Sequence, residues 1–129
     1  MPLVRIDLVE GRTDAEVATL ADTVQEVLED VFAAPARDRY QVISEHRPGR
    51  LVLHDTGLGF ERSDGVVLVQ VVQQGRTTAQ KQALYAALAE RLEAKAGVAP
   101  TDLVVSVTEN TRADWSFGLG RAQFLEGEL

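Results

Sequence analysis

An internal repeat is the feature of this sequence that most constrains its fold. When the sequence is shifted by about 64 residues it matches itself without gaps, with roughly ten identities over about 43 pairs. The match includes the triplet Gly11-Arg12-Thr13, which falls on Gly75-Arg76-Thr77, and it covers about residues 3–45 and 67–109. The sequence therefore predicts two similar halves, separated by an inserted loop at 46–65 and followed by a C-terminal tail at 110–129.

Each half carries the same pattern of secondary structure. An apolar run rich in β-branched residues predicts a strand, and a helix follows the Gly-Arg-Thr turn. Thr13 with Glu16, and Thr77 with Gln80, fit the capping box, in which side chains and backbone amides three residues apart satisfy each other. The expected ranges are strands at 3–9, 40–44, 66–72 and 103–108, and helices at 14–32 and 78–96.

A strand–helix–strand unit of this length has parallel strands. Two such units predict one α/β (α+β) domain over 1–129, in which a four-stranded mixed sheet carries both helices on one face. The inserted loop is expected to hold a turn at Pro48-Gly49, a short strand at Leu51-Val52-Leu53 and a further loop. Two helices cover only one face of the sheet, so we expect the other face to pack against further subunits.

The composition argues against several classes of function. The 129 residues include no cysteine and only two histidines, which argues against a thiolate or multi-histidine metal site and against a cysteine nucleophile. The formal net charge of −7 provides no positive field for nucleic acid. No apolar run approaches the length of a membrane span and no secretory signal is visible, so we expect a cytoplasmic protein that binds neither membranes nor nucleic acid.

Pro2 is the first candidate for chemistry. Proline after the initiator methionine permits removal of Met1, which leaves a secondary amine directly before the first strand. Such an amine titrates near neutral pH and can act as a base, as an acid or as a nucleophile toward a carbonyl. Proline is also common at this position without any function. The equivalent position of the second half, Val66, is mid-chain, so only the first half can carry a terminal amine.

Three polar residues near the ends of predicted strands are further candidates. Gln74 and Arg76 follow the third strand, and an arginine at a strand-to-helix turn suits a carboxylate ligand. Asp38 precedes the second strand. The alternative interpretation is structural: the arginine supports a turn at the surface, and the aspartate forms one.

The tail contains the aromatic residues Trp115, Phe117 and Phe124. They either pack in the core or an interface, or they line a pocket. Gly118 and Gly120 do not form a phosphate loop, because the required lysine and following helix are missing.

These segments together resemble the tautomerase superfamily, and more closely its malonate semialdehyde decarboxylase group. The resemblance runs almost without gaps from Pro2 to the C-terminus. The segments that carry it are Pro2-Leu3, Glu10-Gly11-Arg12-Thr13-Asp14, Asp38-Arg39-Tyr40-Gln41, His46-Arg47-Pro48-Gly49, Asp55-Thr56-Gly57-Leu58-Gly59, Gly75-Arg76 and Asp114-Trp115-Ser116-Phe117-Gly118.

The resemblance implies a homotrimer that needs neither a metal nor an organic cofactor. It implies that the amine of Pro2, in its charged form, acts on a small 3-oxo or 2-oxo carboxylic acid. In the decarboxylase this amine polarises the aldehyde oxygen of malonate semialdehyde or forms an iminium with it. Asp38 matches the aspartate that favours the charged proline, and Arg76 matches an arginine that holds the substrate carboxylate. The residues that match an apolar wall near the site are Trp115, Phe117, Phe124 and Leu129.

The chain departs from this group just after the third strand. The group has arginine, one further residue and arginine there, whereas this chain has Gln74, Gly75 and Arg76. Glutamine can hydrogen-bond a carboxylate but adds no charge. Three functions are therefore open: decarboxylation of malonate semialdehyde; keto–enol tautomerisation of a phenylpyruvate-like acid, or hydration or dehalogenation of an unsaturated acid; and non-catalytic binding by a trimer.

Overall fold

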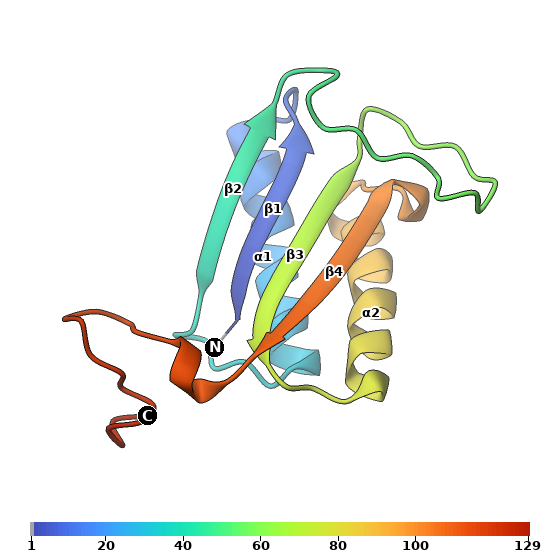
Figure 1. Cartoon of the computed structure of the whole chain (residues 1–129). Coiled ribbons are helices and arrows are strands. Elements are labelled where there is room, and N and C mark those ends of the chain that lie inside the picture. The colour runs from blue at the N-terminus through green and yellow to red at the C-terminus, as the bar shows by residue number, and fades with distance from the viewer. Residues whose placement is uncertain (1) are drawn as a thin grey trace.

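The computed structural model describes residues 2–129, whose elements follow the order expected for two strand–helix–strand units (Figure 1). The first unit consists of β1 (Leu3–Val9), α1 (Asp14–Val31) and β2 (Tyr40–His46). The second consists of β3 (Val67–Gln74), α2 (Thr78–Ala96) and β4 (Leu103–Asn110). Two short 3-10 turns, at Pro100–Asp102 and Arg112–Asp114, precede and follow β4.

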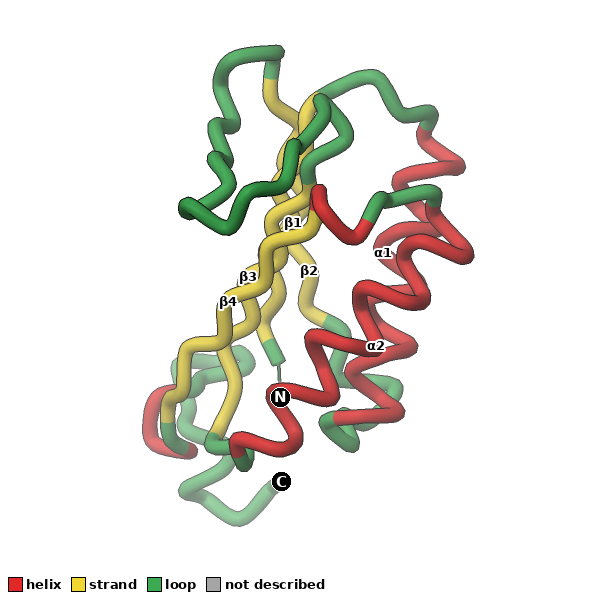
Figure 2. Tube along the Cα trace, turned by 90° about the vertical axis from the view of Figure 1, so that its right-hand side faces the viewer, coloured by secondary structure: helices red, strands yellow, loops and turns green. Residues whose placement is uncertain are grey.

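The four strands form one mixed sheet in the order β2-β1-β3-β4. β1 is parallel to β2 and β3 is parallel to β4, while β1 and β3 are antiparallel at the centre. Both helices lie on the same face of the sheet, as two perpendicular views show (Figure 1, Figure 2). The predicted fold class is therefore confirmed.

Each helix begins at the capping box that the sequence predicts. The Thr13 hydroxyl accepts a hydrogen bond from the Glu16 amide, and the Glu16 carboxylate accepts one from the Thr13 amide. Thr77 and Gln80 repeat this arrangement at α2. The second cap fixes the start of α2, and with it the tight turn after β3 that contains Arg76.

The core lies between the sheet and the two helices. Alternate residues of each strand face the helices, because successive side chains of a strand point to opposite faces. Each helix contributes one apolar stripe to the same layer. The buried residues of this core include Val4, Ile6, Leu8, Val67, Val69 and Val71 from the strands, and Leu20, Ala21, Val24, Val27, Leu28, Leu84, Leu88 and Leu92 from the helices.

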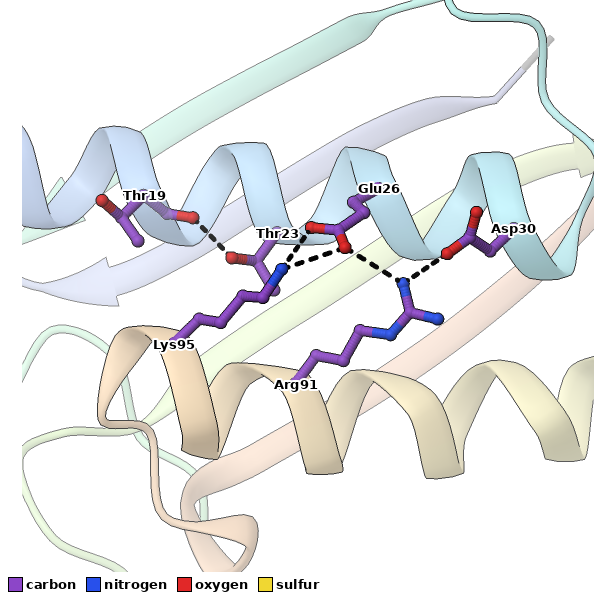
Figure 3. Close-up of polar contacts among 6 residues, drawn as sticks. All are labelled: Thr19, Thr23, Glu26, Asp30, Arg91 and Lys95. Carbon is purple, nitrogen blue, oxygen red and sulfur yellow. Dashed lines mark hydrogen bonds and ion pairs between the residues drawn. The ribbon is translucent and has the colours of Figure 1, made fainter.

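Charged side chains also join the two helices (Figure 3). Lys95 of α2 lies 2.8 Å from a carboxylate oxygen of Glu26 on α1. Arg91 of α2 lies 2.6 Å from Asp30 and 3.5 Å from Glu26. These side chains are partly exposed, so each pair contributes at most about 1 kcal/mol, and the buried stripes dominate the association of the helices.

Several elements end at positions other than the predicted ones. β3 continues to Gln74 and β4 to Asn110, because these two residues pair with each other beyond the apolar runs. β2 continues to His46, which pairs with Val9. α1 ends at residue 31 rather than 32. The predicted strand ends follow hydrophobicity, whereas the observed ends follow backbone pairing.

The predicted short strand at Leu51-Val52-Leu53 is wrong. These residues belong to no strand, and the Val52 side chain is 65% exposed. After Pro48-Gly49 the chain leaves the sheet and runs as a loop beyond the ends of the strands (Figure 1). A strand requires the edge of a neighbouring strand for its hydrogen bonds, and this apolar run is not placed beside one.

The face of the sheet opposite the helices has no covering layer of helices in the single chain (Figure 2). It combines exposed or half-buried apolar side chains, such as Val42 and Leu68, with the exposed Arg5. Asp7 and His46 also meet on this face, with Oδ1 and Nε2 2.7 Å apart. Such a face is consistent with packing against other subunits.

Candidate functional site

A pocket of about 430 Å³ lies at the end of the sheet where β1 begins and β3 ends. Its floor is a row of paired strand residues, namely Leu3 of β1 with Tyr40 of β2 and Val72 of β3. Leu3 faces away from the helices, because its neighbour Val4 lies in the core. The other lining residues are Asn110, Asp114, Trp115, Ser116 and Phe117. The pocket therefore adjoins the position of Pro2, one residue before Leu3.

Aromatic rings form one wall of this pocket. The rings of Trp115 and Phe117 are stacked, with centroids 5.5 Å apart and planes at 15°. Tyr40 also stacks on Phe117, at 6.0 Å and 28°. Phe124 meets the same ring edge-on at 5.3 Å. The three aromatic residues singled out in the tail are thus in one cluster, and Trp115 and Phe117 line the pocket.

Hydrogen bonds fix the start of the tail against the end of β4. The Trp115 indole Nε1 donates to Asn110 Oδ1 at 3.0 Å. The Asp114 carboxylate accepts hydrogen bonds from the Thr111 amide at 2.7 Å and from its hydroxyl at 2.9 Å. These bonds stabilise the ionised carboxylate and lower the pKa of Asp114. The tail therefore turns sharply after β4 and presents its aromatic rings to the pocket.

Arg76 is held at the turn after β3 by main-chain carbonyls. Its Nε and Nη2 donate to the Phe32 carbonyl at 3.2 and 2.9 Å. Its Nη1 donates to the carbonyls of Gln74 and Gly75 at 3.0 and 3.1 Å. Phe32 is the C-cap residue of α1, and the last carbonyls of a helix need partners from outside it. The guanidinium is thus a positive charge whose orientation is set by α1 and β3.

The backbone of this turn is anchored to β4 through Glu109. The Glu109 carboxylate accepts a hydrogen bond from Lys81 Nζ at 2.5 Å and another from the Arg76 amide. The lysine and then the amide lower the pKa of Glu109. Gln74 ends β3 beside this turn, and the Nε2 of the buried Gln73 lies 3.4 Å from its Oε1.

The remaining predicted site residues lie around the same end of the sheet. Pro2 is buried directly before β1, and the removal of Met1 concerns a residue outside the described ones. Asp38 is half-buried two residues before β2, and its amide donates to the Pro35 carbonyl at 2.9 Å. Leu129 is 58% exposed. Within residues 2–129, neither Asp38 nor Leu129 has a described hydrogen bond or ring contact with the aromatic cluster.

Tyr40 and Asn110 line the pocket but were not among the site residues proposed from the sequence. Tyr40 joins the pocket through its register with Leu3, and Asn110 through its bond to Trp115. An apolar pattern does not reveal strand register, which depends on pairing between distant segments. The available signal was the segment Asp38-Arg39-Tyr40-Gln41, which carried the resemblance without assigning a role to Tyr40.

A second pocket, of about 500 Å³, lies at the opposite end of the sheet and is lined by Val9, Val66 and residues of the inserted loop. Among the described residues there is no group of three or more histidine, aspartate or glutamate side chains placed to hold a metal ion. None of the helices in the described part of the chain has the length and apolar character needed to cross a bilayer.

Comparison with known proteins identifies the family. Two family models, each described as "Tautomerase enzyme", match residues 38–118 and residues 2–61. The probable tautomerase YrdN of Bacillus subtilis (strain 168) is 48% identical over 129 residues, which span 100% of both chains.

Solved structures extend the comparison. A crystal structure of malonate semialdehyde decarboxylase, described in terms of its decarboxylase and hydratase activities, is 49% identical, covers 98% of each chain and has a TM-score of 0.95. A fused 4-OT, described as a symmetric trimer, shares the fold at 21% identity, with a TM-score of 0.79 over 97% of this chain and 98% of that one. The chain therefore belongs to the tautomerase superfamily, and its fold is very close to that of malonate semialdehyde decarboxylase.

Proposed function

We propose that this protein decarboxylates malonate semialdehyde (3-oxopropanoate) to acetaldehyde and carbon dioxide, with the amine of Pro2 as the catalytic group. The observation that carries the proposal is the pocket that adjoins Pro2 and is walled by Trp115 and Phe117. The 49% identity to malonate semialdehyde decarboxylase over 98% of each chain supports the same reaction.

When carbon dioxide leaves, negative charge develops on the remaining part of the substrate, and the site must stabilise it. The bond between the carboxylate and the central carbon breaks, and its electron pair moves toward the aldehyde oxygen. A protonated Pro2 amine stabilises this charge by hydrogen-bonding the oxygen, and protonation of the central carbon then gives acetaldehyde. In the alternative route the amine first loses its proton, attacks the aldehyde carbon and expels water to form an iminium, which accepts the electron pair; protonation of the central carbon and hydrolysis of the iminium then release acetaldehyde. The proposal gives Asp38 the role of the opposite charge that keeps the amine protonated.

Arg76 supplies the positive charge that receives the substrate carboxylate. The carbonyls of Phe32, Gln74 and Gly75 orient its guanidinium in advance, which reduces the entropy lost on binding. The Gln74 amide adds a neutral donor nearby. The aromatic wall of Trp115, Phe117 and Phe124 excludes water, and a poorly solvated carboxylate loses its charge more easily.

The working unit that we propose is a homotrimer. The sheet face opposite the helices carries uncovered apolar side chains, and a protein of the same fold is described as a symmetric trimer. Native mass spectrometry or sedimentation should give three times the mass of the chain, and a stable monomer at micromolar concentration would refute this assembly.

The decisive experiment begins with the intact mass, because only removal of Met1 frees the Pro2 amine. The protein is then incubated with malonate semialdehyde, and acetaldehyde is measured through NADH consumption by alcohol dehydrogenase. Pro2→Ala should lose the activity, whereas Pro35→Ala, at an exposed proline after α1, should keep it. Activity retained by Pro2→Ala would refute the proline mechanism, and no acetaldehyde from the wild-type protein would refute the decarboxylase.

The second candidate is keto–enol tautomerisation of a phenylpyruvate-like 2-oxo acid. The descriptions of the family models and of YrdN support it, as does Gln74 in place of a second arginine. A tautomerase requires a neutral Pro2 as base, whereas decarboxylation requires the charged amine. Titration of the Pro2 nitrogen by NMR separates the two: a charged amine at neutral pH, with a pKa that falls in Asp38→Asn, supports decarboxylation.

Hydration of an unsaturated acid would also use the charged amine, and the similar decarboxylase is described as having hydratase activity as well. Including such an acid in the substrate panel distinguishes hydration, which adds water, from decarboxylation, which releases carbon dioxide. A protein that retains Met1 and turns over none of these acids would instead be a non-catalytic binding protein.

A further inference from the structure

We propose that the hydroxyl group of Tyr40 donates a hydrogen bond to the carbonyl oxygen of the substrate, and so shares with Pro2 the stabilisation of the charge that develops there. This inference rests on the proposed function, because it concerns an oxo acid whose carbonyl meets Pro2. It assigns a catalytic role to a residue outside the Pro2, Asp38 and Arg76 set.

Strand pairing puts Tyr40 beside the start of β1. Tyr40 is the first residue of β2 and its Cα pairs with that of Leu3, the first residue of β1. Paired strands lie about 4.8 Å apart, and a tyrosine side chain is long enough to span that separation. Tyr40 and Leu3 both line the pocket that adjoins Pro2, so the phenol belongs to the same cavity as the proposed substrate.

The strand order puts Tyr40 and Arg76 on opposite flanks of Pro2. Tyr40 lies on β2, to one side of β1, whereas Arg76 follows β3, on the other side. In the proposed binding mode, the carboxylate of a short oxo acid lies on the β3 flank, the side of Arg76, and its carbonyl end lies across the start of β1 on the side of Tyr40. In this mode the carbonyl oxygen of a three-carbon acid is shared by the Pro2 amine and the phenol.

The contacts of Tyr40 suit a fixed hydrogen-bond donor. Its ring is stacked on Phe117 with centroids 6.0 Å apart, which restricts the orientation of the phenol. The residue remains 39% exposed and lines the pocket. Of the other polar residues of the lining, the ionised Asp114 can only accept hydrogen bonds, and the Asn110 amide is oriented by the bond that its Oδ1 accepts from Trp115.

The chemistry determines which kinetic constant should respond. The carbonyl oxygen becomes more negative as the carbon–carbon bond breaks, so a donor to that oxygen stabilises the transition state more than the bound substrate. Loss of such a donor lowers kcat and leaves KM nearly unchanged. Hydrogen bonds to charged groups correspond to roughly 10- to 100-fold in rate.

The test compares Tyr40→Phe with Tyr85→Phe. Both substitutions delete one hydroxyl from a side chain that is 39% exposed, but Tyr85 lies on α2, remote from the pocket in sequence and outside its lining. Because phenylalanine keeps the ring that stacks on Phe117, both variants should unfold within about 1 °C of the wild-type protein.

The expected result is a fall of about 10-fold or more in the kcat of Tyr40→Phe, with KM within threefold of wild type and Tyr85→Phe within twofold in kcat. A kcat of Tyr40→Phe within twofold of wild type would overturn the inference. So would an equal fall in Tyr85→Phe, since the loss would then not depend on the pocket.

If the wild-type protein does not decarboxylate malonate semialdehyde, the proposed function fails, and the role of Tyr40 is measured by binding instead. Trp115 is the only tryptophan and lines the pocket, so its fluorescence reports on occupancy by the 2-oxo acid pyruvate. Tyr40→Phe should weaken binding about 3- to 10-fold, with Tyr85→Phe unchanged. Equal dissociation constants in all three proteins, or no binding to the wild type, would overturn the inference.

Discussion

Replacing Arg76 by methionine is expected to loosen the junction between α1 and β3 as well as to remove a charge from the site. The guanidinium donates two hydrogen bonds to the carbonyl of Phe32, a fully buried residue at the end of α1. In Arg76→Met this carbonyl loses both donors. A buried or part-buried polar group without a partner costs about 1–3 kcal/mol, so we expect the free energy of unfolding to fall by about 2 kcal/mol.

Arg12 offers a matched control, because it occupies the corresponding turn of the first half. Its one described hydrogen bond runs from Nη2 to the Gly65 carbonyl at 3.0 Å. Arg12→Met should therefore cost about 1 kcal/mol. For a chain of this length 1 kcal/mol corresponds to about 4 °C in Tm, so the expected falls are about 8 °C for Arg76→Met and about 4 °C for Arg12→Met.

Thermal unfolding followed by circular dichroism measures both falls, at one fixed protein concentration because assembly of subunits also affects Tm. Arg76→Lys separates charge from geometry: lysine keeps the charge but lacks the fork that reaches several carbonyls. It should retain more activity than Arg76→Met while still unfolding below the wild type. If Arg76→Met unfolds within 2 °C of wild type while Arg12→Met unfolds lower, the structural role of Arg76 is refuted.

Three further substitutions test other parts of the molecule. Thr77→Ala removes the hydroxyl that caps α2 and should lower the free energy of unfolding by about 1 kcal/mol in urea denaturation; an unchanged value would contradict the cap. Leu88→Ala empties a fully buried position and should cost about 2–5 kcal/mol in the same assay, and a cost below 1 kcal/mol would contradict tight packing there. The amides of Gly57 and Gly59 donate to Asp55 and lower its pKa, so this contribution to stability is present above the pKa of the unfolded aspartate and is lost as the pH falls through the lower folded value. The NMR shifts of both glycine amides should follow that acid titration, and Asp55→Asn should abolish it; an unchanged titration would exclude Asp55 as its cause.

The elements of the fold could be predicted because local chemistry specifies them. Thr13 with Glu16, and Thr77 with Gln80, define both helix starts from four side chains that are close in sequence. The failure at Leu51-Val52-Leu53 has the opposite cause, since an apolar run becomes a strand only where another strand edge is available. The local sequence does not show whether such a strand edge is available to pair with.

The site was predictable to the extent that its residues lie at the ends of recognisable elements. Trp115 and Phe117 were candidates as aromatic residues of the tail, and they meet in the pocket wall. The two hydrogen bonds from the Arg76 guanidinium to the Phe32 carbonyl were not predictable, because they join segments 44 residues apart. Tyr40 was missed for the same reason, since its place depends on the register of β2 against β1.

Because β1 and β3 are antiparallel, the starts of the two halves lie far apart, and a substitution near one start need not affect the other. The first strand residues of the two halves, Leu3 and Val67, lie toward opposite ends of this pair of strands, about 17 Å apart along them, because Val67 pairs with Leu8. One end has the pocket beside Leu3, and the other has the pocket beside Val66. Substitutions around Val66 therefore leave the surroundings of Pro2 untouched, so one end of a single gene product can acquire new residues while selection preserves the other.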